Sequence, residues 1–127
     1  MNLLSRIFVF AAAMALSLSS VHAEHHLSVH YKGKAGPGKG KHVVLVSGDE
    51  EYRSEECLPM LGRILADHHG FDCTVLFSVN DKGEIDPNNQ KSVTNAKAMA
   101  SADLIIITLR FRNWPDEDMK HFAEAYH

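Results

Sequence analysis

The sequence predicts an α/β fold, a parallel β-sheet of three strands in the order 2-1-3 with helices between them. Three short apolar stretches rich in β-branched residues support this prediction: His42–Ser47, Asp72–Val79 and Asp103–Leu109. Continuous apolar runs of this length are typical of strands buried on both faces of a sheet. Strands that alternate with helices are joined by right-handed parallel crossovers, which gives the order 2-1-3.

The segment between the first two runs is predicted to be a helix over Ser54–His69, because its leucine and isoleucine residues recur at helical spacing. Ser54 is the expected N-cap, and Gly70 suits the left-handed residue that ends a helix. Pro59 lies near the start and predicts an irregular first turn. A shorter, alanine-rich helix is expected over Ser92–Ala102.

A last helix is predicted to begin at Pro115, and the sequence ends at His127 inside its apolar pattern. A three-stranded parallel sheet leaves two open edges and a half-supported helix. Residues 42–127 are therefore expected to be the N-terminal part of a larger α/β domain, truncated after the third strand and the following helix. The exposed edge of the third strand is a candidate for self-association.

Residues 1–23 are predicted to be a signal peptide. Arg6 supplies the positive charge, and Ile7–Leu18 is an uncharged apolar run, too short for the ~20 residues that a membrane span needs. Val21 and Ala23 occupy the positions expected before a cleavage site. The mature protein is thus expected to be secreted or periplasmic, with residues 24–41, rich in histidine, lysine and glycine, as a flexible lead-in.

The charge balance excludes some classes of partner. Without the signal peptide, acidic residues outnumber basic ones, which argues against binding to nucleic acid or to an acidic membrane surface. Cys57 and Cys73 are expected to be free thiols, because two cysteines are too few for a disulfide-built scaffold. No metal or cofactor is predicted: the segment from Gly33 to Lys39 imitates a phosphate loop, but Gly40 replaces the required serine or threonine.

Ligands of open parallel sheets collect outside the carboxyl ends of the strands. In the order 2-1-3, the segments after the first and third strands emerge side by side, and both carry charged and aromatic residues. The candidate ligand-binding residues are Asp49, Glu51, Tyr52, Arg53, Arg110 and Arg112, with Phe111 as a second flat surface. Paired carboxylates and arginines can hold sugars, carboxylates or phosphates. They can equally form a structural ion-pair network in solvated loops.

Two stretches, VVLVSGDEEYRSEECLPML (Val43–Leu61) and ADLIIITLRFRNWPDEDMKH (Ala102–His121), resemble ThuA-like proteins, a family named for trehalose utilisation. FDCTVLF (Phe71–Phe77) and GPGKGKHVV (Gly36–Val44) add to the likeness, which is greatest to exported members. The resemblance implies a flavodoxin-like fold of the class I glutamine amidotransferase type and a link to carbohydrate metabolism. It implies no glutaminase chemistry.

Together these observations predict an exported ThuA-like protein that binds or processes a carbohydrate-derived small molecule, such as trehalose or a keto-sugar. The residues leave open whether it is an enzyme. The alternatives are a noncatalytic sugar-binding or interaction module, and an inactive fragment of a larger protein.

Overall fold

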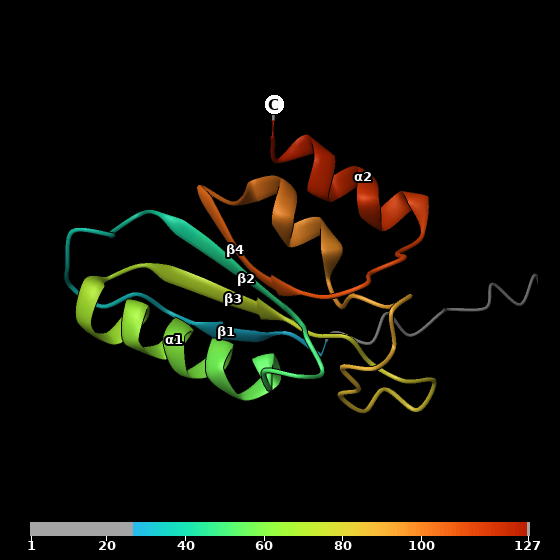
Figure 1. Ribbon diagram of the computed structural model, residues 1–127. Helices are drawn as coiled ribbons and strands as arrows, with labels where there is room; N and C mark the ends of the chain where they lie inside the picture. The colour runs from blue at the N-terminus through green and yellow to red at the C-terminus, as the bar shows by residue number, and fades with distance from the viewer. Residues whose placement is uncertain (1–26, 127) are drawn as a thin grey trace, which may run out of the picture.

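The computed structural model describes residues 27–126, which form three layers with a four-stranded sheet in the middle (Figure 1). The elements in chain order are β1 (Val29–Tyr31), β2 (His42–Gly48), α1 (Ser54–His69), β3 (Asp72–Leu76), the 3₁₀ helix η1 (Ala96–Ser101), β4 (Leu104–Leu109) and α2 (Asp116–Glu124). Helix α1 covers one face of the sheet, and η1 and α2 cover the other (Figure 1). The predicted signal peptide and its cleavage site lie outside the described residues.

The α/β class is as predicted, but the sheet is not the three-stranded parallel sheet with order 2-1-3. Its order is β1-β3-β2-β4, and it is mixed: β2 pairs in parallel with β3 and β4, whereas β1 pairs antiparallel with β3. The additional strand comes from the predicted lead-in, where Val29 lies opposite Val75 and Tyr31 opposite Cys73. Three residues are too few to show an alternating pattern, so sequence periodicity did not reveal this strand.

The glycine-rich segment that follows β1, predicted as part of a flexible lead-in, is largely exposed but is hydrogen bonded to the end of α1. The Lys34 N–H donates to Ala66 O over 3.0 Å, and the Gly38 N–H donates to His69 O over 2.8 Å. A Cβ atom at Gly33 would lie 2.2 Å from the carbonyl oxygen of Gly70. Glycine at this position therefore allows two backbone segments to touch, and the segment is built into the end of α1.

The C-terminal end of α1 is as the local sequence predicted, whereas its first turn is not. Gly70 has φ 80°, and its N–H donates to Ala66 O, so it is the left-handed C-terminal residue that was predicted. The expected irregular first turn is not seen, because α1 continues from Ser54 through Pro59 to His69. The helix predicted in the alanine-rich segment is present as the 3₁₀ helix η1, which is shorter than the predicted range Ser92–Ala102.

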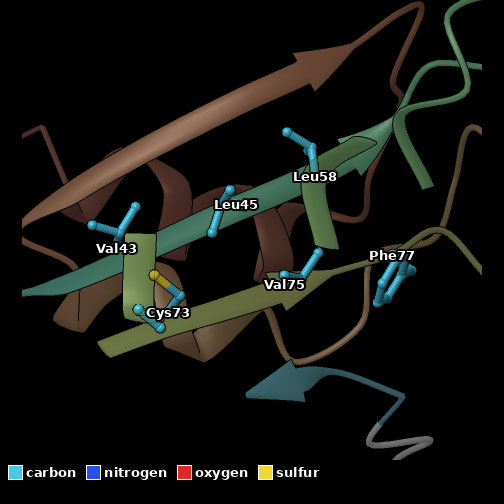
Figure 2. Packing of buried hydrophobic residues seen from close by; sticks show 7 residues of the cluster. Val43, Leu45, Leu58, Cys73, Val75 and Phe77 are labelled. Atoms are coloured by element: carbon cyan, nitrogen blue, oxygen red, sulfur yellow. The ribbon is translucent and has the colours of Figure 1, made fainter. Parts of the chain in front are cut away.

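Two hydrophobic cores hold the layers together. Between α1 and the sheet, Val43 and Leu45 of β2 and Val75 of β3 pack near Leu58 of α1 (Figure 2). The other core packs β2 and β3 against η1 and Trp114, and Phe122 of α2 lies at its margin. Strand β2, buried from Val43 onward, contributes to both cores because its side chains alternate between the two faces. None of the helices between residues 27 and 126 has the length and hydropathy needed to cross a bilayer.

Both cysteines are free, as predicted, but they differ in environment: Cys57 is exposed and Cys73 is buried. Burial raises the pKa of Cys73 to about 11, and the charge of Asp72 adds to the shift. Because the thiolate is the reactive form, we expect one thiol per chain to react with Ellman's reagent at about pH 8 and the second only after unfolding. Cys57→Ser should remove the fast reaction. Two thiols that react fast in the native protein would contradict this burial.

Candidate functional site

The ends of β2 and β4 bring the two predicted groups of site residues together. Gly48 lies opposite Leu109 in the parallel ladder, and the Arg110 N–H donates to Gly48 O over 3.2 Å. The segments after these strands, residues 49–53 and 110–115, therefore start side by side. A Cβ atom at Gly48 would lie 3.3 Å from the Arg112 side chain and still closer to Leu109, so glycine leaves room for the arginine.

The loop after β2 is a fixed turn organised by Asp49 and Ser54. The buried Asp49 side chain accepts hydrogen bonds through Oδ1 from the N–H groups of Glu51, at 2.9 Å, and Tyr52, at 3.1 Å. Ser54 is the first residue of α1, not its N-cap, and its hydroxyl accepts from the Asp49 N–H and lies 2.9 Å from the Ser47 hydroxyl. The cap is Arg53, in the left-handed region at φ 52°. Asp49 thus shapes the loop and presents Tyr52, which is 72% exposed.

Arg110 joins the two loops. It forms an ion pair with Glu51, and its Nε lies 3.9 Å from Glu50 Oε1. The guanidinium carbon also lies 4.9 Å from the centre of the Phe111 ring, within the range of a cation–π contact. The two segments therefore emerge side by side, as the sequence predicted, and Arg110 after β4 reaches the acidic loop after β2.

Arg112 has a different role from the one expected. Its guanidinium is almost fully buried, with 7% of the side chain exposed. It donates to three backbone oxygens, those of Arg110 at 2.6 Å, Asn89 at 3.0 Å and Pro87 at 3.1 Å, and to the Ser78 hydroxyl at 3.1 Å. Glu50 lies 3.6 Å from Arg112 Nη2. These contacts take up four of the five N–H donors of the guanidinium, so Arg112 fastens the loop before η1 to the end of β4. Its burial leaves ligand contact mainly to other residues.

The charge of Arg112 is compensated in place. Burial lowers the pKa of its guanidinium, and the negative charges of Glu50 and Asp49 oppose that shift. An arginine side chain stays protonated in proteins, so the buried cation depends on these carboxylates. Glu50, which was not among the predicted site residues, is therefore the acid that both arginines share. The sequence feature that could have identified Glu50 as a site residue is its position between two other acids, Asp49 and Glu51.

Arg53 and Phe111 differ in whether they belong to the candidate site. Arg53 pairs with Glu56 on the first turn of α1, so its ion pair points along the helix and not toward Arg110. Phe111 lies between the two arginines with φ 51° and is 66% exposed. A bulky residue in the left-handed region is strained, and such strain concentrates at functional sites. Phe111 therefore belongs to the candidate site together with Tyr52.

A cavity of about 370 Å³ lies between η1 and α2. It is lined in part by Asn95, Glu117, Asp118 and His121, and by none of the six predicted residues. Burial raises the pKa of the Asp118 carboxyl, and the charge of Glu117 adds to that shift. The His121 Nδ1 atom lies 3.3 Å from Glu124 Oε2. The cavity thus has both apolar and charged groups in its lining, and it is distinct from the cluster of charged and aromatic residues after β2 and β4.

Over residues 27–126, no group of three or more histidine, cysteine, aspartate and glutamate side chains is arranged to hold a metal ion. His25 and His26, in the predicted lead-in, lie outside these residues. Comparison of the chain with protein-family models, curated proteins and solved structures gave no significant match.

Proposed function

We propose that the residues after β2 and β4 bind a neutral, hydroxyl-rich small molecule derived from a carbohydrate. The observation that carries this proposal is the arginine–carboxylate cluster of Arg110, Glu50 and Glu51, flanked by the exposed rings of Tyr52 and Phe111. An anionic ligand would have to displace a carboxylate from Arg110. A hydroxyl group can donate to the carboxylates and accept from the guanidinium without a change in net charge, so it suits the cluster better.

The two aromatic rings support the same ligand class. Tyr52 follows the turn fixed by Asp49, and Phe111 is flanked by Arg110 and by the buried Arg112. Aromatic rings provide flat apolar surface at a small cost in conformational entropy, which suits packing against the C–H face of a sugar ring. A strained, exposed phenylalanine contributes little to the stability of the free protein, which favours a role in binding.

The similarity of GDEEYRSEE and RFRNWPDE to ThuA-like proteins supports membership of that family, an amidotransferase-type fold and a role in trehalose or keto-sugar metabolism. The predicted signal peptide supports export. We favour binding over catalysis because the Asp49 carboxylate is hydrogen bonded to backbone and the arginine donors are paired. Processing of the bound sugar remains the second candidate and is distinguished by turnover.

Phe111→Gly is expected to weaken sugar binding about tenfold, since an aromatic contact is worth ~0.5–1.5 kcal/mol. The same change should leave the fold intact or stabilise it by about 1 kcal/mol, because glycine accepts φ 51° without strain. Binding of trehalose and glucose would be measured by titration calorimetry, with inorganic phosphate as the anionic comparison and product analysis to detect turnover.

Tyr126→Ala is the matched control, because Tyr126 is equally exposed but lies at the end of α2. It should bind these sugars as the wild type does, whereas Tyr52→Ala should resemble Phe111→Gly. Phosphate binding that exceeds sugar binding would overturn the ligand class. Sugar binding unchanged in both Tyr52→Ala and Phe111→Gly would overturn the site.

A further inference from the structure

The cavity between η1 and α2 is walled by three parts of the chain. Helices η1 and α2 lie side by side on one face of the sheet (Figure 1), and residues 93–95, which lead into η1, complete the wall together with Val79. The volume of about 370 Å³ falls within the range of ~300–1,000 Å³ that is typical of small-molecule sites. None of the residues proposed to bind sugar lines this cavity, so any ligand here occupies a separate site.

The part of the wall that leads into η1 is fixed by Thr94. The Thr94 hydroxyl accepts a hydrogen bond from the Phe77 N–H over 2.9 Å and donates to Leu27 O over 3.2 Å, and the Thr94 N–H donates to Phe77 O over 2.8 Å. The next residue, Asn95, lines the cavity in the left-handed region at φ 48°, a conformation that asparagine tolerates better than most residues. These bonds fix this part of the wall in the absence of a ligand, as is usual for small-molecule sites.

Two carboxylates, those of Glu117 and Asp118, form the acidic part of the wall. Within residues 27–126, neither forms a side-chain hydrogen bond or an ion pair. Lys97 also lines the cavity but is paired with neither acid, and His121 has its Nδ1 atom 3.3 Å from Glu124 Oε2. Burial raises the pKa of the Asp118 carboxyl, the charge of Glu117 adds to the shift, and the charge of His121 opposes it. A cation beside these two acids would therefore relieve an unfavourable arrangement of charge.

The position of these acids at the start of α2 does not by itself account for their place in the cavity. The helix dipole favours acidic residues throughout the first turn, and Asp116 meets this preference while it is exposed and outside the cavity lining. Asp118 is half-buried in a wall that also contains Val79, Val93 and Ala96. Burial of a charged group beside apolar surface costs free energy unless the charge is paired, so the dipole alone would leave Asp118 as exposed as Asp116.

We propose that the cavity binds a small organic amine, with its ammonium group beside Glu117 and Asp118 and its carbon skeleton against the apolar part of the wall. An ammonium group supplies three hydrogen-bond donors and a positive charge, which suits a pair of carboxylates. The amide oxygen of Asn95 is a further acceptor in the same wall. A metal ion suits the cavity less well, because the described part of the chain contains no group of three or more histidine, cysteine, aspartate and glutamate side chains arranged to hold one.

Three ligands of the same shape and different charge test the proposal on the full chain: benzylamine, benzyl alcohol and benzoate. At neutral pH, benzylamine should bind with a Kd of about 1–10 mM and at least about tenfold more tightly than the other two. Amide shifts in two-dimensional NMR spectra should be largest for residues 93–97 and 117–121. The fluorescence of Trp114 gives a second readout, because the centre of its ring lies 6.3 Å from that of Phe122 on α2. Benzyl alcohol or benzoate binding as tightly as benzylamine would overturn the ligand class.

Asp118→Asn keeps the size of the side chain and removes its charge, so it should weaken benzylamine binding about fivefold or more. Asp116→Asn is the matched control. It removes the same charge from the same helical turn, but Asp116 is exposed and outside the cavity, so its variant should bind benzylamine as the wild type does. Equal weakening by both variants would indicate a general attraction to negative charge and would overturn the site. Unchanged binding in Asp118→Asn, or no benzylamine binding by the wild type, would do the same.

Discussion

Arg112→Ala is expected to lower the free energy of unfolding by about 3 kcal/mol, because it removes the buried partner of several polar groups. The carbonyl oxygens of Pro87 and Asn89 and the hydroxyl of Ser78 would lose their donor. Glu50 would lose one of its two cationic neighbours. Urea unfolding followed by circular dichroism measures the change.

Arg110→Ala is the matched comparison, since Arg110 lies two residues away, carries the same group and is more exposed. Exposed ion pairs contribute ~0–1 kcal/mol, so its effect on stability should stay below about 1 kcal/mol. Arg112→Lys should be intermediate, because an ammonium group keeps the charge but cannot reproduce the planar set of donors. Equal losses for Arg110→Ala and Arg112→Ala would show that the buried contacts of Arg112 contribute nothing to stability.

Comparison of the two arginine variants also distinguishes a contribution to the structure from a contribution to ligand binding. Arg112→Ala should loosen residues 80–90 and the backbone at Phe111, so any loss of sugar binding would come with faster amide exchange in that loop. Arg110→Ala should weaken binding with little change in exchange. Arg112 is therefore best described as a positioning residue, and Arg110 as the arginine available to the ligand.

Local patterns predicted the elements of this fold well, and long-range contacts explain what they missed. The apolar runs in β2, β3 and β4 and the glycine at the end of α1 are local signals, and the structure has all of them. The burial of Arg112 depends on the carbonyl oxygens of Pro87 and Asn89, more than 20 residues earlier in the chain. No spacing rule connects such positions, so the sequence indicated which segments form the candidate site but not the role of each arginine.

The segment after β1 is a second case in which a long-range contact could not be predicted from the local sequence. A glycine- and lysine-rich stretch without periodicity is typical of a tether, and nothing in its own sequence indicates that it packs against the end of α1. In the structure, close neighbours leave no room for a Cβ atom at these glycines: Gly36 lies near the His69 backbone, and Gly38 lies against the Phe71 ring. These glycines pack against residues 66–71, which lie about 30 residues further along the chain. The composition of the segment alone therefore indicated a flexible stretch.

Gly33→Ala tests this packing, because a packed segment and a detached tether predict opposite changes in the free energy of unfolding. A Cβ atom at Gly33 would lie 2.2 Å from Gly70 O and 2.7 Å from Gly70 C, and neither backbone atom can rotate away. The two segments would have to separate, so we expect a loss of about 3 kcal/mol in the free energy of unfolding, at the upper end of overpacking effects.

Gly40→Ala is the control for this prediction. Gly40 lies in the same stretch with φ 80°, and its Cβ position is open, so only backbone strain of about 1 kcal/mol should be felt. In a detached tether, both substitutions would be neutral or would stabilise the protein by ~0.4–1 kcal/mol, because alanine restricts the unfolded chain more than glycine does. Thermal and urea unfolding of the two variants measure the difference. A Gly33→Ala protein as stable as the wild type would mean that the segment is not anchored to the end of α1.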